Sequence, residues 1–149
     1  MNEEDLRRLV RTLASGEHES ECVEFKENRA EAEEIGAYLS AISNSAALHQ
    51  QDVGYIVWGV RDGDHKIVGS TFLPRHASAK VGNEDLEAWL SRMLHPRIDF
   101  RIHELEVDGH HVVVFEVPAA SHTPVRFRHT EFIRVGSYRK KLRDHPEKE

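Results

Sequence analysis

The sequence predicts an α+β fold, in which a mixed, largely antiparallel sheet is covered by about three helices. Two observations lead to this class. Helical periodicity occurs in three separate segments, at residues 3–15, 31–48 and 84–94. The remaining elements follow one another closely, in the order α, β, α, β, β, α, β, β, β, β, so most strand pairs are expected to be hairpins and therefore antiparallel.

The three helices are predicted from their ends and from their apolar stripes. Asn2 and the acidic residues after it can begin the first helix, and Gly16 can end it. The second helix, residues 31–48, carries an apolar stripe at helical spacing: Ile35, Tyr38, Leu39, Ile42 and Ala46. Asn83 is expected to cap the third helix, which ends before Pro96.

The first strands are predicted from alternation and from an apolar run. Residues 22–26 alternate, so Val23 and Phe25 should face one side of the sheet. Residues 53–60 are nearly all apolar, which is typical of a central strand buried on both faces. A turn then leads into residues 65–69, which are expected to return as a hairpin partner.

The second half of the chain predicts another hairpin and a polar end. Asp108-Gly109 is a strong turn signal between two alternating segments, and two short strands are expected on either side of His129. We therefore expect one domain over residues 1–137. Residues 138–149 are polar, and they are expected to form a tail or the start of a linker to a domain that this chain lacks.

Composition narrows the class of protein. No apolar run is long enough to span a bilayer, so no membrane partner is expected. The single cysteine, Cys22, excludes an internal disulfide framework and a cysteine-based zinc site, and it favours a reducing cytoplasm. The phosphate-binding loop, the dinucleotide fingerprint, the H-E-x-x-H zinc motif and the serine nucleophile elbow are all absent from the sequence.

Charge is distributed unevenly along the chain. The formal net charge is −6 at pH 7, yet residues 126–143 contain seven basic residues and only one acidic residue, Glu131. Residues 1–34 show the opposite balance, with 11 acidic and 5 basic residues. The two ends could form one site, in which acids hold cations and bases hold phosphates; the alternative is two ordinary solvated surfaces.

Three carboxylates are candidates for such a site. Glu19 and Glu24 lie five residues apart near the strand at 22–26, and Asp62 follows the central strand. If these two strands pair, the three side chains could converge at one end of the sheet. Carboxylates are the ligands that Mg²⁺ and Mn²⁺ prefer. By spacing alone, however, exposed carboxylates without a function remain the commoner explanation.

Four motifs in order strengthen the first interpretation. They are ESECVEFKEN at residues 19–28, AISNS at 41–45, GYIVWGVRDGDHKIVG at 54–69 and FIRVGS at 132–137. Together they resemble the Schlafen-type AlbA-like domain over about residues 17–137. The resemblance implies a mixed α/β fold that binds nucleic acid, either RNA or DNA.

The resemblance also implies an activity and its residues. In the nuclease-active Schlafen proteins this domain is a metal-dependent endoribonuclease that acts on structured RNA such as transfer RNA. The acidic triad matches Glu19, Glu24 and Asp62, which would be both the catalytic residues and the ligands of Mg²⁺ or Mn²⁺. The residues expected to hold the phosphate backbone are Lys26, Arg61, Arg134, Arg139, Lys140 and Lys141.

The same resemblance also implies an alternative function and the need for a second lobe. In many bacterial relatives the domain is part of a longer protein, so this chain could be a non-catalytic regulatory module that binds DNA or RNA. The active nucleases combine two such lobes into a clamp. A homodimer or a second domain would be needed to complete a clamp here.

Overall fold

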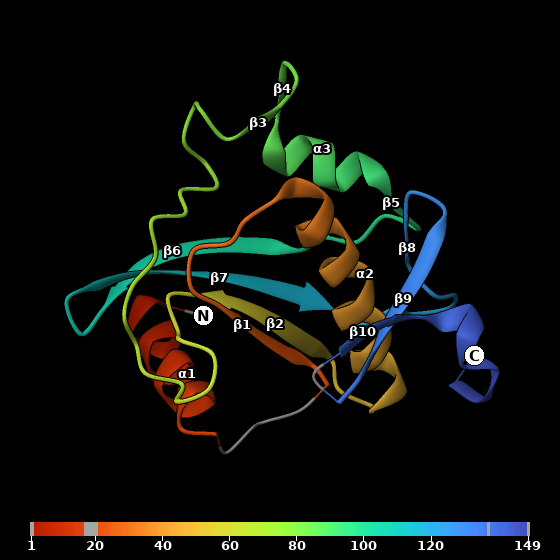
Figure 1. The fold of residues 1–149 in the computed structure, drawn as a ribbon, viewed down its shortest axis with the longest axis horizontal. Coiled ribbons are helices and arrows are strands. Elements are labelled where there is room, and N and C mark those ends of the chain that lie inside the picture. The colour runs from red at the N-terminus through yellow and green to blue at the C-terminus, as the bar shows by residue number, and fades with distance from the viewer. Residues whose placement is uncertain (1, 17–20, 137, 149) are drawn as a thin grey trace.

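The computed structural model describes residues 2–16, 21–136 and 138–148 (Figure 1). Over these residues it confirms the predicted α+β class with three helices. The helices and strands are α1 (Glu3–Ala14), β1 (Val23–Lys26), α2 (Ala32–Leu48), β2 (Val53–Trp58), β3 (Lys80–Val81), β4 (Glu84–Asp85), α3 (Leu86–Met93), β5 (Leu94–His95), β6 (Arg101–Val107), β7 (His110–Pro118), β8 (Arg126–Phe127), β9 (Thr130–Val135) and β10 (Tyr138–Lys141). Two short 3₁₀ turns, η1 (Leu142–Asp144) and η2 (Pro146–Lys148), follow β10.

The strands form two four-stranded sheets and one small hairpin. The larger sheet has the order β1-β2-β7-β6, and the second has the order β10-β9-β8-β5. β1 and β2 run parallel, because α2 carries the chain back between them, and every other neighbouring pair is antiparallel. The prediction of a mixed, largely antiparallel sheet is therefore confirmed, and the strands at 22–26 and 53–60 are neighbours.

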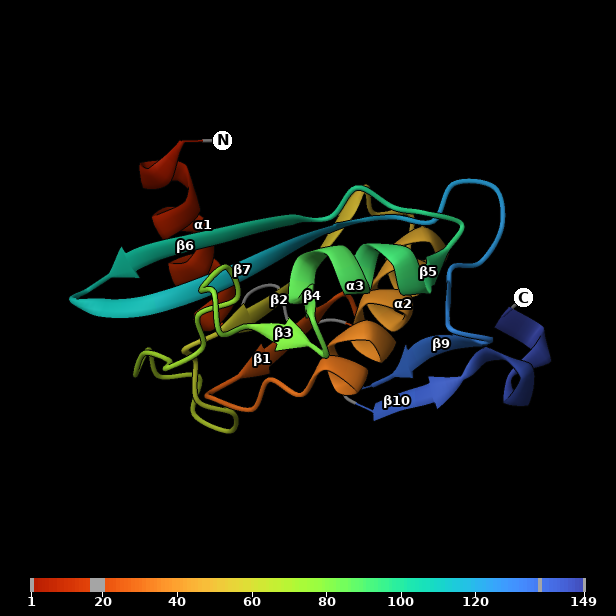
Figure 2. The same ribbon diagram turned by 90° about the horizontal axis from the view of Figure 1, so that it is seen from above.

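Helix α2 lies between the two sheets and is buried on almost every side (Figures 1 and 2). Its apolar residues pack with side chains of β2, β7 and α3 in the main core, including Trp58, Phe115 and Leu90. Gly54 on β2 permits this close approach. A Cβ atom at that position would lie 2.4 Å from Cγ2 of Ile42 and 2.7 Å from the carbonyl oxygen of Cys22.

The other surface of α2 is polar, although it too is buried. Ser40, Ser43, Asn44 and Ser45 hydrogen-bond to backbone groups in strands or directly beside them. The Asn44 side chain donates to the carbonyl oxygens of Val125 and Phe132, both at 2.9 Å, and accepts from the Val125 N–H at 2.7 Å. These bonds satisfy buried backbone groups, so α2 attaches the second sheet through polar as well as apolar contacts.

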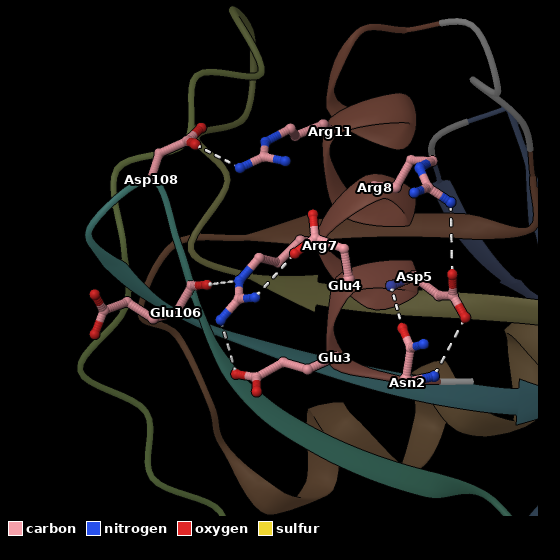
Figure 3. Close-up of polar contacts among 9 residues, drawn as sticks. All are labelled: Asn2, Glu3, Glu4, Asp5, Arg7, Arg8, Arg11, Glu106 and Asp108. Atoms are coloured by element: carbon pink, nitrogen blue, oxygen red, sulfur yellow. Dashed lines mark hydrogen bonds and ion pairs between the residues drawn. The ribbon is translucent and has the colours of Figure 1, made fainter.

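Helix α1 covers the opposite face of the larger sheet, where Leu6, Val10 and Leu13 pack on its apolar side chains. Asn2 and Asp5 form a capping box at its start (Figure 3). Two arginines then hold the helix to the β6–β7 hairpin. Arg7 Nε donates to the carbonyl oxygen of Glu106 at 2.8 Å, and Arg11 pairs with Asp108 at 2.8 Å (Figure 3).

Two details of the prediction are wrong. Residues 65–69 form only a single bridge, Val60 to Ile67, because the Gly59 carbonyl accepts from the N–H groups of Val68 and Gly69, and the chain then leaves the sheet. Asn83 does not cap α3. It lies in the β3–β4 turn, and the helix begins at Leu86, whose N–H donates to the Ala79 carbonyl at 2.9 Å.

The segment after residue 137 contains one more strand. Tyr138–Lys141 forms β10 because its backbone pairs antiparallel with β9, and Leu142 just after it is 2% exposed. This pairing makes β10 the edge strand of the second sheet, next to α2 (Figure 2). Within the described part of the chain, no helix has both the length and the apolar character needed to cross a membrane.

Candidate functional site

A cleft of about 540 Å³ opens where β1, α2, β9, β10 and the loop after β2 meet. We call it the carboxylate cleft. Its lining residues are Glu21, Val23, Glu24, Phe25, Tyr38, Asp62, His65, Arg134, Gly136 and Tyr138. Two of the three predicted carboxylates, Glu24 and Asp62, therefore lie in one cavity. The third, Glu19, lies outside the described residues.

Glu24 is a half-buried carboxylate with three partners in and around the cleft. Its side chain is 14% exposed and pairs with Arg134 at 3.0 Å and with Lys26 at 3.7 Å, and the Tyr38 hydroxyl is a further hydrogen-bond partner. Burial raises the pKa of Glu24, and the nearby cations Arg134 and Lys26 offset only part of that rise. Because Glu24 lies on β1 beside β2, the parallel pairing fixes its position in the cleft.

Arg134 is an internal partner of Glu24. It is 3% exposed, and its guanidinium also donates to the carbonyl oxygen of Val23. The sequence predicts that Arg134 holds the phosphate backbone. In the structure it lies in the wall of the cleft, bound to a carboxylate and to the backbone of β1.

Lys26, Tyr38 and Arg139 form a stack beside Glu24. The Lys26 Nζ lies 4.5 Å from the centre of the Tyr38 ring, and the Arg139 guanidinium lies 4.9 Å from the same ring. Lys26 also pairs with Glu34 at 2.7 Å. Burial and then the negative charge of Glu24 raise the pKa of Tyr38 to about 12. The stack gives this part of the cleft a fixed arrangement of charges.

Asp62 and the remaining predicted cations are exposed. Asp62 accepts a hydrogen bond from the Gly63 N–H at 3.1 Å, within the turn that follows β2. Arg61, beside it, pairs with Asp64 at 3.0 Å and is directed into the same turn. Lys140 and Lys141 are exposed on β10. Of the predicted phosphate ligands, Arg61, Lys140 and Lys141 are therefore the exposed ones.

The described residues supply only part of a possible metal site. In residues 2–16, 21–136 and 138–148, no group of three histidine, cysteine, aspartate or glutamate side chains has the arrangement to hold one ion. Glu24 and Asp62 offer carboxylate oxygens, which suit Mg²⁺ or Mn²⁺. Glu21 already accepts from the Gly136 N–H and hydrogen-bonds to His49. Although burial favours its neutral form, these two partners lower the pKa of Glu21.

Several residues of the cleft were not among the predicted site residues. Tyr38 was assigned to the apolar stripe of α2, and His65 was assigned to a returning strand. Glu21 lies three residues before Glu24 in the same acidic motif, and this proximity was the only indication in the sequence that it could belong to the site. Tyr138 was part of the expected tail, where an isolated tyrosine among basic residues gave little indication of a site.

Comparisons with known proteins agree with this architecture. A family profile described as Schlafen, AlbA_2 matches residues 19–143, which contain every residue of the carboxylate cleft but not α1. The crystal structure of the DIP2311 protein from Corynebacterium diphtheriae is similar, with a TM-score of 0.58 and 17% identity. That match covers 93% of this chain and 26% of that one, so this chain spans about a quarter of its neighbour's length.

A second solved structure is similar over most of both chains. It is the N-terminal domain of a RecG-related protein from Nitrosomonas europaea, named for its relation to an ATP-dependent DNA helicase. The TM-score is 0.52 and the identity 21%, and the match covers 80% of this chain and 78% of that one. A search of curated proteins finds no significant match.

Proposed function

The chain belongs to the Schlafen, AlbA_2 family, and from this premise we propose that it binds nucleic acid and acts as a metal-dependent endoribonuclease on structured RNA such as transfer RNA. One observation carries the proposal. Glu24 and Asp62 come from separate segments but line one cleft, and the basic residues of β10 follow Tyr138, which lines the same cleft. A site of this kind can hold a phosphodiester between an acidic centre and cationic side chains.

Carboxylate oxygens are the donors that a hard divalent cation prefers. Glu24 and Asp62, together with Glu19, would hold Mg²⁺ or Mn²⁺, which would stabilise charge on a phosphoryl oxygen or activate a water molecule. The protein's own contribution is orientation. Arg134 and Lys26 keep the Glu24 carboxylate in one place in the cleft wall, while Asp62 remains accessible on its turn.

Binding would depend on the exposed cations. Lys140 and Lys141 on β10 can neutralise phosphates, and each phosphate contact releases counterions from the nucleic acid. Affinity should therefore fall steeply as the salt concentration rises. Arg139 is held against Tyr38, so we assign it a structural part in shaping this edge of the cleft.

The test compares Asp62→Asn with Asp64→Asn. Both residues are exposed on the same turn, but only Asp62 lines the cleft, so Asp64→Asn controls for changes in the turn itself. Purified protein is incubated with a transfer RNA transcript and Mn²⁺. We expect Asp62→Asn to cleave about 100-fold more slowly than wild type, and Asp64→Asn to cleave at a similar rate to wild type. Cleavage that survives EDTA, or that Asp62→Asn leaves intact, would contradict the proposal.

A non-catalytic module that binds RNA or DNA is the second candidate. It is favoured by one observation: the Glu24 carboxylate is already neutralised by Arg134 and Lys26, which lowers its capacity to bind a cation. On this alternative, a gel shift would be sensitive to salt but not to EDTA or to Asp62→Asn, and no cleavage would occur. Both candidate functions allow a homodimer or a second domain to complete a clamp. Analytical ultracentrifugation with and without RNA would show whether the chain forms the homodimer.

A further inference from the structure

Tyr138 is an unusually exposed aromatic side chain. Among the described residues, three large hydrophobic side chains are exposed: Leu48 at 39%, Leu73 at 47% and Tyr138 at 69%. Tyr138 is also the one of these three that lines the carboxylate cleft. Because most of this ring is exposed beside a charged cleft, it can stack on a flat partner.

The surroundings of Tyr138 are strongly cationic. Alternate residues of a strand share a face, so Tyr138 and Lys140 lie on the same side of β10, and the Lys140 Nζ is 5.7 Å from the centre of the tyrosine ring. Lys141 and Arg143 follow closely and are exposed. The partner that complements this surface is both aromatic and anionic.

The strand that carries Tyr138 is held on both sides of Arg139 by neighbouring elements. β10 is paired along its length with β9, and Arg139 is held between the rings of Tyr38, at 4.9 Å, and Phe132, at 5.4 Å. Because Arg139 fixes one face of the strand, the other face presents Tyr138 and Lys140 in a defined direction. Because the backbone under the ring is already paired, stacking a ligand has to order only the side chain, which lowers the entropic cost of binding.

We propose that Tyr138 is a stacking platform for an unpaired base at the entrance of the carboxylate cleft, with Lys140 neutralising the phosphate next to that base. Bases inside a duplex are already stacked on their neighbours, so only a base in a single strand, loop or end can use this ring. The inference rests on the proposed function and narrows it, because it makes the preferred substrate single-stranded or looped RNA.

The experiment measures the affinity of the full chain for two probes by fluorescence. One is a single-stranded RNA that carries a 2-aminopurine, whose emission is quenched on stacking, and the other is the same sequence as a duplex. We expect Tyr138→Ala to bind the single strand about tenfold more weakly than wild type and to lose the quenching, while its affinity for the duplex is unchanged. Tyr138→Phe keeps the ring and should behave as wild type.

Two further variants separate stacking from charge. Lys140→Ala should lower the slope of log affinity against log salt concentration by about one for the single strand, whereas Tyr138→Ala should leave that slope unchanged. Leu73→Ala removes an exposed apolar side chain outside the cleft, so it should change neither affinity nor quenching. Thermal unfolding of each variant verifies that the fold is retained, as expected for exposed positions.

The outcomes distinguish this inference from the function on which it rests. If Tyr138→Ala binds the single strand with wild-type affinity and quenching, or weakens single strand and duplex equally, the stacking platform is refuted while nucleic-acid binding stands. If the wild type binds neither probe, both the platform and the proposed function are refuted. A loss of affinity in Leu73→Ala equal to that in Tyr138→Ala would also overturn the platform, because the effect would not be specific to the cleft.

Discussion

Replacing Asn44 by alanine is expected to destabilise the protein by about 4 kcal/mol. Asn44 is 6% exposed on α2, and its side chain makes three hydrogen bonds to the backbone that leads into and forms the second sheet. The perturbation therefore removes a polar connection between α2 and the part of the molecule that forms one wall of the cleft.

The magnitude follows from which backbone groups lose a partner. The Val125 N–H loses its acceptor at 2.7 Å, and the Phe132 carbonyl loses a donor at 2.9 Å. The Val125 carbonyl loses one donor but keeps the Ser40 hydroxyl at 2.7 Å. Two groups are thus weakened without replacement, at about 1–3 kcal/mol each. The sum is a large part of the total stability of about 5–15 kcal/mol that is usual for a domain.

Urea unfolding monitored by circular dichroism provides the measurement, with Asn28→Ala as the matched control. Asn28 is also an asparagine that accepts from a loop backbone N–H, that of Thr71 at 2.9 Å, but it is exposed, so water can replace the lost bond. We expect the control to lose about 1 kcal/mol or less. If the two variants lose the same free energy of unfolding, burial of the Asn44 bonds is not what stabilises the second sheet.

Two further predictions concern the cleft. Glu24→Ala should lower the free energy of unfolding by about 3 kcal/mol, because it leaves Arg134 buried without its carboxylate; urea unfolding measures this, and stability equal to that of Asp62→Asn would contradict the pairing. Burial and then Glu24 raise the pKa of Tyr38 from 10.0 to about 12. The folded state therefore favours the protonated phenol, and the free energy of unfolding should be unaffected by this group below pH 10 and should fall as the pH rises toward 12. Tyr38→Phe should lack this loss, and parallel pH profiles of variant and wild type would refute the assignment.

Local signals in the sequence were sufficient for most of the fold. The hairpin at Asp108-Gly109 was predictable because both turn residues have positive φ angles, and turns of this type prefer the residue pair Asp-Gly. The central strand β2, Val53–Trp58, was predictable from the apolar run at residues 53–60, because apolar runs of that length are typical of central strands. The attachment of α2 to the second sheet could not be predicted, because the sequence does not distinguish a buried asparagine such as Asn44 from an exposed polar residue on a helix.

The candidate site was predictable in part. Convergence of Glu24 and Asp62 depended on one condition, the pairing of their strands, and β1 does pair with β2. The burial of Arg134 could not be foreseen, because alternation in β9 does not show that its polar side meets a carboxylate. Tyr138 was missed because the pairing that orders β10 is a long-range backbone contact, which side-chain periodicity does not report.

Helix α1 covers an apolar surface that the matched residues alone would leave exposed. It lies outside the matched residues 19–143, yet its side chains shield Val57, Val112 and Val114 from water. A fragment trimmed to the family limits would expose that valine-rich plane, which is the kind of surface that drives precipitation. The same fragment would also lack Arg7 and Arg11, which bind α1 to the β6–β7 hairpin.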